Sequence, residues 1–508
     1  MSPAASRPHP AGAPASRPRP RSQARRTPPR RRPAPALLWR SALEGAAASL
    51  CAVTAMLFLS VLALSLVNAG SVGSTRSLAL AVTAMAVGGA VSAHSTASST
   101  GSQATGMGGM FGGGMSPTVS GAVDLMPLGV TLLGTLVLWF VFSRRLPQLS
   151  ENELAVRIAG TVTAASISLT IVAGLASGTL KLPKSAMSGL GAGGSATGTT
   201  GGGSPLSGLL GSGANGLAVG YHVDPVSAMF GSVLWLAVVL TVGCLISRRV
   251  RLQLGGLLDR LRPHWAPGLS ALLRTLLILG AAPLLVFTLV GIVAGGRVQT
   301  AAGAALLLAP NAVIVLLTLG LGSPWTASTH PASPQGGNPM AGMMGGTGGS
   351  PFAGQHDRTL HLDSLTTAGW PLWLAALAVA LVALLGCAAV AARTGSTTRP
   401  RKPRQDLLAG PLGLPIKFSV TTAAVLGAVA WMATGQVHLS LGLFGMQMGG
   451  IRAGVSDNVL WTITAALLMG ALAGWAGPVL QTKFLPKGRI RSAREPGVGE
   501  HHPRWTRV

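Results

Sequence analysis

The chain has 508 residues, of which 48% are hydrophobic and only 10% are charged. This composition excludes an ordinary soluble protein and is typical of an integral membrane protein. The formal net charge of +26 would suit a nucleic-acid-binding protein, but the lysines and arginines are concentrated in the two tails and beside apolar segments, and no nucleic-acid-binding motif is present. We therefore expect no nucleic acid as a partner.

The two tails are basic and poor in apolar residues. Residues 1–38 are mainly Pro, Arg, Ala and Ser, and such a segment cannot bury enough apolar surface to fold. We predict a disordered cytoplasmic tail there and a second basic cytoplasmic tail over residues 483–508. Both favour contact with anionic lipids of the inner leaflet. The alternative is that their charges only fix the topology.

Ten apolar segments lie between the tails. Each approaches the roughly 20 residues that a helix needs to cross the hydrocarbon. They cover residues 44–69, 77–93, 125–143, 158–177, 225–247, 272–294, 299–320, 370–392, 417–435 and 458–480.

Loop charges decide how these segments thread through the membrane. If all ten cross, nine loop lysines and arginines lie inside and twelve lie outside. If segments 77–93 and 299–320 do not cross, fifteen lie inside and six outside. Only the second arrangement obeys the positive-inside rule.

The same two segments have unusual sequences. Gly88 and Gly89 interrupt the first, and Pro310 and Asn311 interrupt the second. Proline removes a backbone donor, and an amide in hydrocarbon needs a partner. We predict two broken or re-entrant helices buried among their neighbours, with ordinary kinked spans as the alternative. The predicted fold is an all-α polytopic transmembrane helix bundle of about eight spans plus these two segments, with ten full spans as the alternative.

The segments divide into two halves with the same order of features, residues 39–246 and 272–482. This order predicts an internal repeat about an axis along the membrane normal. Residues 247–271 between the halves have leucines on one face and arginines elsewhere, which predicts a cytoplasmic amphipathic linker. Ser150 and Glu153 predict a capping box at the start of the fourth segment.

Four aspartates each precede an apolar segment. They are Asp124, Asp224, Asp363 and Asp457. A carboxylate at this position can accept free backbone N–H groups and complement the helix dipole, so we interpret all four as helix caps. The alternative is a vestibule of carboxylates that guides cations.

Residues that carry chemistry are scarce. No acidic residue lies in the middle of an apolar segment, where coupled carriers place ionisable groups. No phosphate loop, HExxH or GxSxG motif is present. We predict no enzyme, no catalytic residue and no cofactor. The outer loops contain Met and His, which suit Cu(I), but without fixed spacing, so no metal ligand is assigned.

Several motifs resemble the streptophobes, a family of very hydrophobic actinobacterial membrane proteins of uncharacterised activity. The resemblance rests on the Arg/Pro-rich tail, the Gly/Ser-rich loop, Leu308-Ala309-Pro310-Asn311-Ala312-Val313, Gly322-Ser323-Pro324-Trp325, and the stretch from His361 through Trp370-Pro371-Leu372-Trp373. It implies a location in a bacterial plasma membrane with several spans. The family supplies no catalytic residue.

Two functions follow as hypotheses. The first is a non-enzymatic, envelope-associated or scaffold protein whose protein partners are unknown. The alternative is a transporter or channel whose path is lined by Gly88, Gly89, Pro310 and Asn311. A polar cavity where the two interrupted segments meet would favour the transporter, and a sealed interior would favour the scaffold.

Overall fold

The structure is a computed structural model of the chain. It describes residues 35–95, 118–144, 150–181, 218–247, 255–293, 295–331, 358–360, 366–367, 370–396, 413–443 and 446–484. The long Gly-rich loops and most of both tails lie outside these residues, and so does Asp363.

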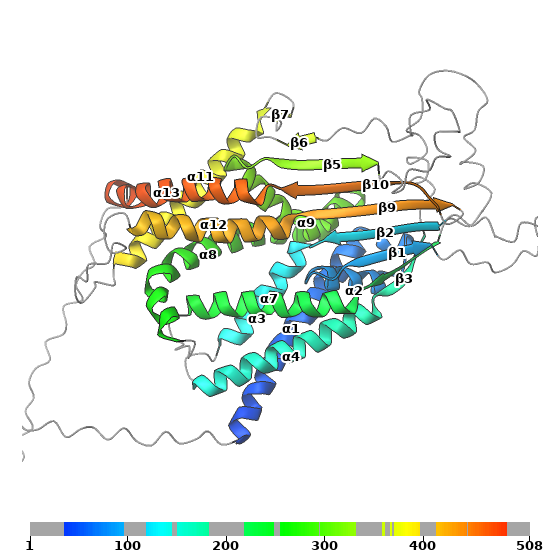
Figure 1. The fold of residues 1–508 in the computed structure, drawn as a ribbon, viewed down its shortest axis with the longest axis horizontal. Coiled ribbons are helices and arrows are strands. Elements are labelled where there is room, and N and C mark those ends of the chain that lie inside the picture. Colours follow the sequence, from blue (N-terminus) through cyan, green and yellow to red (C-terminus); the bar gives the residue numbers. More distant parts are fainter. Residues whose placement is uncertain are drawn as a thin grey trace, which may run out of the picture.

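Ten α-helices form a bundle in the described part of the chain (Figure 1). They are α1 (Pro35–Leu66), α2 (Thr75–Met85), α3 (Leu128–Ser143), α4 (Glu151–Leu175), α7 (Pro225–Ile246), α8 (Gly255–Val293), α9 (Gly296–Gly320), α11 (Leu372–Ser396), α12 (Gly413–Ala433) and α13 (Val459–Phe484), with a 3-10 turn, η1 (Ala69–Ser71), after α1. Eight of them, all except α2 and α3, are long and apolar enough to cross a membrane. The chain is therefore an integral membrane protein.

An antiparallel sheet, which the predicted all-helical fold did not include, extends from one end of this bundle (Figure 1). Its eight described strands are β1 (Val91–Ser95), β2 (Thr118–Leu125), β3 (Ser177–Lys181), β4 (Ala218–Val223), β5 (Trp325–Pro331), β6 (Arg358–Leu360), β9 (Gly435–Leu443) and β10 (Met446–Asp457). Their order is β3-β4-β1-β2-β9-β10-β5-β6. A separate small hairpin pairs β7 (Thr366–Thr367) with β8 (Trp370–Pro371). We call this side of the bundle the sheet end and the opposite side the far end.

Alternation in β4 explains how the sheet sits on the helices. Val219, Tyr221 and Val223 are buried, whereas His222 is exposed, because successive side chains of a strand point to opposite faces. Tyr221 and Val223 share a hydrophobic cluster with alanines of α2 and α4. The Tyr221 hydroxyl also donates a hydrogen bond to Ser77 Oγ at 2.9 Å. One face of this part of the sheet therefore packs on helices, and the other is exposed.

The sheet determines which helices cross the membrane. An open sheet has edge groups that hydrocarbon cannot satisfy, so the sheet lies outside the hydrocarbon, on one side of it. Between β4 and β5 the chain runs through α7, α8 and α9. A chain that leaves one side of a membrane and returns to it crosses an even number of times. One of these three helices therefore does not cross.

Helix α9 is the one that stays at the sheet end. A Cβ on Gly303 would collide with the Ala63 carbonyl in the last turn of α1, and a Cβ on Gly320 would collide with the Ala376 carbonyl near the start of α11. The two glycines are 17 residues apart, which is about 26 Å of helix, yet both contacts lie near the sheet end of a span. Helix α9 therefore runs crosswise below the sheet.

The other long segments cross the membrane. Helix α3 has 16 residues, about 24 Å, and it crosses together with α4 because both lie between β2 and β3. The crossing helices are α1, α3, α4, α7, α8, α11, α12 and α13. The structure confirms an all-α polytopic bundle with eight described helices long and apolar enough to cross, a set that by length includes α9 and not α3. Helix α2 has only 11 residues, which contradicts ten full spans. The exclusion of α9 is our inference from the sheet. Pro35 begins α1 and Phe484 ends α13, both at the far end of the bundle.

The two interrupted segments differ from each other. Segment 77–93 is broken as predicted, since α2 ends at Met85 and β1 begins at Val91. The prediction of a break is wrong for segment 299–320, because α9 is a continuous helix that contains Pro310. The predicted amphipathic linker 247–271 overlaps the start of α8, which runs without interruption from Gly255 to Val293.

Local signals at two helix starts are confirmed. Ser150 and Glu153 form the predicted capping box of α4, in which each side chain bonds the backbone of the other residue. Pro225 occupies the first turn of α7, where its missing N–H has no partner to lose.

Small residues bring α1 and α4 close together in the first half. A Cβ on Gly45 would collide with the Arg157 carbonyl, and a Cβ on Gly160 would lie 2.5 Å from the Ala42 carbonyl oxygen. Glycines at such crossings let helix backbones approach within van der Waals distance. The close approach positions the polar groups described below.

Candidate functional site

The start of α3 is the point where the two interrupted segments meet. The Asn311 side chain of α9 makes two hydrogen bonds to this backbone. Its Oδ1 accepts from the Leu128 N–H at 3.0 Å, and its Nδ2 donates to the Met126 carbonyl at 2.9 Å. Asn311 is 8% exposed. Its amide thus satisfies the Leu128 N–H, a donor that the first turn of a helix leaves without a partner, and the carbonyl of Met126 just before the helix.

Pro310 belongs to the same contact. A proline in a helix cannot donate to the carbonyl four residues earlier, which here is Leu306. That carbonyl faces Gly129 of α3 so closely that a Cβ on Gly129 would collide with it. A backbone Cα–H of glycine is the donor that such a close approach permits. Pro310 and Asn311 therefore attach α9 to the first turn of α3.

Gly88 and Gly89 end α2. Gly88 has a positive φ of 95°, its N–H bonds the Met85 carbonyl, and the Gly89 N–H bonds the Ala84 carbonyl. These two bonds form a Schellman motif, in which a glycine takes the left-handed position after a helix. The turn packs on the first half of α7, since a Cβ on Gly231 would collide with the Val87 carbonyl.

The two interrupted segments also touch the same part of α3. The Thr131 hydroxyl donates to the Ala86 carbonyl at the end of α2 at 2.7 Å. A Cβ on Gly88 would lie 2.9 Å from the Met126 methyl group. The structure therefore brings the predicted path residues Gly88, Gly89, Pro310 and Asn311 to the two sides of one helix start. Their polar atoms bond backbone there, which is a packing role.

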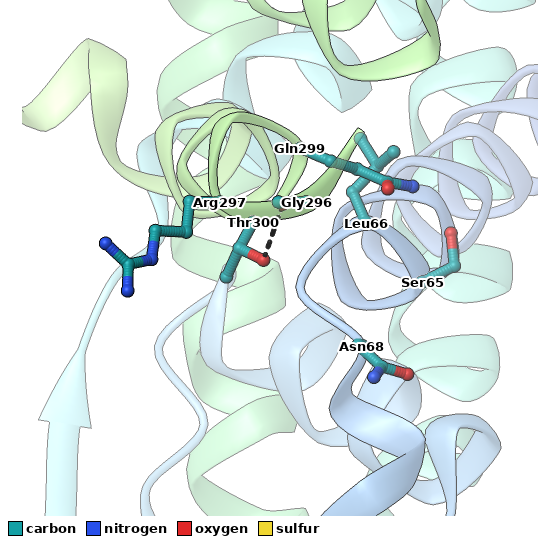
Figure 2. Close-up of a pocket in the computed structure, with 7 residues that line it drawn as sticks. All are labelled: Ser65, Leu66, Asn68, Gly296, Arg297, Gln299 and Thr300. Atoms are coloured by element: carbon teal, nitrogen blue, oxygen red, sulfur yellow. Dashed lines mark hydrogen bonds between the residues drawn. The ribbon is translucent and has the colours of Figure 1, made fainter. Parts of the chain in front are cut away.

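A polar pocket of about 440 Å³ lies between the end of α1 and the start of α9 (Figure 2). Its lining contains none of the four predicted path residues; it consists of Ser65, Leu66, Asn68, Gly296, Arg297, Gln299 and Thr300. Figure 2 shows Gln299 reaching toward Ser65 while Arg297 extends in the opposite direction. Thr300 bonds the Gly296 carbonyl at 3.3 Å. The pocket is thus a polar recess at the sheet end, without a converging charge.

The aspartates that precede spans have three different environments. Asp224 caps α7, because its two carboxylate oxygens accept from the Val226 and Ser227 N–H groups at 3.1 Å. Asp124 does not cap α3, since it is an exposed residue of β2 and the N-cap position is Pro127. The cap interpretation is wrong for Asp124 because the strand continues past it.

Asp457, at the end of β10, accepts hydrogen bonds from two hydroxyl groups on different elements. Its carboxylate accepts from Ser323 Oγ at 2.9 Å and from Thr462 Oγ1. The side chain of the next residue, Asn458, accepts from the Trp461 N–H at 3.3 Å in the first turn of α13. Asp457 therefore fixes the turn after α9 against α13, and Asn458 supplies the backbone cap.

The described aspartates do not form a ring. Asp224 follows β4, Asp124 lies in β2 and Asp457 ends β10, and one other strand separates each from the next in the sheet order. Strands are about 4.8 Å apart, so these carboxylates form a row with gaps of roughly 10 Å between neighbours. Such a row does not enclose a vestibule.

The Asp224 cap has a pH dependence that can be measured. Hydrogen bonds from the Ser227 and Val226 N–H groups hold the pKa of the Asp224 carboxyl below its ordinary value. A lowered folded-state pKa means that the cap stabilises the fold above the unfolded pKa and is lost as pH falls through the folded pKa. Thermal unfolding in detergent below about pH 4 should therefore depend less on pH in Asp224→Asn than in the wild type, because Asn caps without a charge. Equal pH profiles would contradict this role.

A buried ion pair between α1 and α4 is the polar site that sequence analysis misses. Arg157 Nη1 lies 3.6 Å from Glu44 Oε2, and the two side chains are 3% and 28% exposed. The Arg157 guanidinium also lies 4.9 Å from the centre of the Phe142 ring. Arg157 stands next to the predicted segment 158–177, so the charge looked like a flanking residue. The signal for burial was Gly160, three residues after Arg157 on the same helix face, together with Gly45 beside Glu44.

Removing one partner of this pair should be costly. We expect Glu44→Leu to destabilise the protein by about 3 kcal/mol or more, because it leaves a buried guanidinium without its counter-charge. The double variant Glu44→Leu/Arg157→Met should lose less than Glu44→Leu alone. Reversible unfolding in detergent gives both values. A double variant less stable than the single one would contradict the ion-pair interpretation.

Histidines lie on the exposed face of the sheet. The His94 and His222 rings stack with centroids 5.7 Å apart, and Ser92 Oγ lies 2.9 Å from His222 Nε2. The register places His222, Ser92 and His438 in one cross-strand row. Among the described residues no group of three or more His, Cys, Asp or Glu could hold a metal. The Met-rich outer loops lie largely outside the described residues.

No protein-family model, curated protein or solved structure matches this chain. The site therefore rests on its own geometry, which consists of a polar junction filled by its own side chains, a buried ion pair and an exposed sheet.

Proposed function

We propose that this protein is a non-enzymatic scaffold of a bacterial plasma membrane. The exposed face of its sheet is the surface that contacts other components of the cell envelope. The observation that carries this proposal is the sheet itself, because it joins strands from both halves of the chain outside the hydrocarbon. The spans below it hold the sheet as a platform. No cofactor and no catalytic residue enter the proposal.

The distribution of basic residues orients the platform. Arg40, Arg144, Arg393 and Lys417 lie at or near the far ends of α1, α3, α11 and α12. The positive-inside rule makes this end cytoplasmic and the sheet extracytoplasmic. Both termini are then cytoplasmic, and the basic tails are placed to contact anionic lipids of the inner leaflet. We also propose that the protein is related to the streptophobes, on the basis of the shared sequence motifs.

We also propose that the two halves arose by duplication. The strand order β3-β4-β1-β2 is followed by β9-β10-β5-β6, and each strand has the same neighbours in its own half. Registers support the correspondence. Val91 pairs with Val223, one residue before Asp224, and Thr326 pairs with Ser456, one residue before Asp457.

The two helices that do not cross also correspond. Helix α9 ends in a second Schellman motif, with Gly322 at a φ of 89°. Its N–H bonds the Leu319 carbonyl, and the Ser323 N–H bonds the Thr318 carbonyl. Gly88 of α2 has the same role before β1. This relation supports a parallel repeat with two crosswise or broken helices at the sheet end.

The contacts of Asn311 favour the scaffold over the transporter. A transport path needs polar groups that can exchange their partners for a substrate. Both polar atoms of the Asn311 amide are already bonded to the start of α3. Opening a path there would leave backbone groups of α3 without partners, at a cost of about 1–3 kcal/mol for each group.

Two assays test the scaffold proposal. Purified protein in liposomes should pass no K⁺, Na⁺ or H⁺ above the level of empty liposomes. A saturable flux that Asn311→Leu removes, per folded protein, and that Ala312→Leu retains would establish the transporter instead. Ala312 is the matched control because it is the exposed neighbour of Asn311 on the same helix.

The second assay concerns the surface. In a deletion strain, the wild type should restore resistance to envelope stress, and the variant Ser92→Glu/His222→Glu/His438→Glu should not, although it reaches the membrane in equal amount. The matched control changes the lipid-facing Phe58, Ile167 and Leu468 to alanine, and it should restore resistance. Full restoration of stress resistance by the sheet variant would contradict the proposal.

A further inference from the structure

The sheet has two open edges in the described part of the chain. Strand β3 stands at one end of the order and β6 at the other, and each pairs on one side only. We propose that these edges pair with each other between copies of this chain, with β6 of one copy beside β3 of the next. The contact would repeat the antiparallel β2–β9 contact that joins the two halves.

The duplication makes the partner specific. In the strand order, β6 is the last strand of the second half, as β2 is the last strand of the first half. Likewise, β3 is the first strand of the first half, as β9 is the first strand of the second half. The chain therefore already contains one copy of the proposed contact. Both edges belong to one sheet, so copies inserted in the same orientation present them at the same height above the membrane. This inference rests on the proposed duplication and not on the scaffold role.

The internal contact also fixes the register on the β6 side. In the β2–β9 pairing, Val123 is opposite Val437. Val123 pairs with Val91 in the first half, and Thr359 pairs with Thr326 in the second. Because Val91 and Thr326 correspond, Thr359 is the counterpart of Val123.

The residue of β3 that takes part in the contact is identified from the helices that precede β3 and β9. Val437 lies four residues after the end of α12 at Ala433, and Thr179 lies four residues after the end of α4 at Leu175. Thr179 is therefore the counterpart of Val437. The proposed contact places Thr359 of one copy opposite Thr179 of the next.

The proposed association is head-to-tail, because different surfaces of the two copies meet. Such contacts form rings when the rotation closes and open chains when it does not. Each contact pairs backbone N–H and C=O groups that an edge strand otherwise exposes. An extended segment of another protein could pair with the same edges, and the experiment below separates that case from self-association.

Cysteine cross-linking between two tagged chains tests the proposal. The background variant carries alanine at Cys51, Cys244 and Cys387. Thr179→Cys in one tagged chain is co-expressed with Thr359→Cys in another, and membranes are treated with a mild disulfide-forming oxidant. We expect a band of twice the monomer mass that carries both tags. Neither variant expressed alone should give that band.

Two controls make the result decisive. Leu180→Cys combined with Thr359→Cys should cross-link far less, since neighbouring residues of a strand point to opposite faces. Val123→Cys/Val437→Cys within one chain should form an intramolecular disulfide, because directly opposite residues have Cβ atoms about 5 Å apart. This second control shows that the oxidant reaches the sheet and that the sheet has formed.

Each co-expressed chain carries a single cysteine, so a disulfide within one chain cannot account for the band. If the internal control pair oxidises while the Thr179/Thr359 pair gives no more dimer than the mismatched pair, self-association through these edges is wrong. The duplication and the scaffold role would be unaffected by that outcome.

Discussion

Asn311→Leu is expected to destabilise the protein by about 2–4 kcal/mol, since it leaves the Leu128 N–H and the Met126 carbonyl buried without partners at about 1–3 kcal/mol each. Leucine has the same number of side-chain heavy atoms as asparagine and a similar branched shape, so it leaves no cavity and the loss would come from hydrogen bonding. The measurement is reversible unfolding of the purified protein in detergent.

The neighbouring residue provides the control for Asn311→Leu. Ala312 is exposed, so Ala312→Leu should change the free energy of unfolding by less than about 0.5 kcal/mol. If both substitutions cost the same small amount, the amide does not hold α9 against α3. Hydrogen exchange at Leu128 gives a second readout, because its N–H loses its acceptor only in the Asn311 variant.

Gly160→Leu should have a comparable effect through packing. The added side chain would meet the Ala42 backbone, whose carbonyl oxygen lies 2.5 Å from the Cβ position. Two helix backbones cannot move apart without disturbing their other contacts, so we expect a loss of about 3 kcal/mol or more. Separation of α1 from α4 would also expose the pair of Glu44 and Arg157.

Helix α4 contains its own control for this prediction. A Cβ on Gly174 would meet nothing within 4 Å, so Gly174→Leu should be close to neutral and gain slightly from helix propensity. The two variants share the helix, the residue change and the added apolar surface. Equal stability of the two would show that α1 and α4 are not in close contact at Gly160. Unfolding in detergent or protease resistance in membranes can make the comparison.

The helix bundle is largely predictable from the sequence because membrane insertion follows simple rules. Segment length, apolar composition and the side on which arginines accumulate depend on neighbouring residues only. These rules predicted about eight spans, in agreement with the eight described helices that are long and apolar enough to cross, and they singled out segment 77–93, where α2 has only 11 residues. They also located the capping box at Ser150, where donor and acceptor are three residues apart.

The sheet was not predictable by the same means. Its strands are short, lie beside Gly-rich loops, and gain their stability from partners in other loops. Strand β2, for example, pairs with β1 and with β9, which lies in the other half of the chain. A pattern with a period of two over five to eight residues is weak when glycines interrupt it.

The role of Asn311 was hidden for a similar reason. Its partner Leu128 is 183 residues away, so no local pattern links the two residues. Gly88 and Pro310 both interrupt an apolar segment, so the order of features in the two halves made them look equivalent. The structure instead gives Gly322 the role of Gly88, since both end a helix in a Schellman motif before a strand. Interruption of an apolar pattern therefore had two causes, a helix end and a contact between helices.

The contact between β2 and β9 also has a consequence for synthesis. Ser120 and Ser440 bond across it with their Oγ atoms 2.6 Å apart, although 320 residues separate them. At about 5–20 residues per second, the ribosome needs roughly 15–60 s to make the intervening chain. During that time the first four strands can assemble, but β2 waits as an exposed edge. The newborn first half therefore has a defined interval in which a wrong strand can occupy the place of β9, and a chaperone that covers β2 would act in that interval.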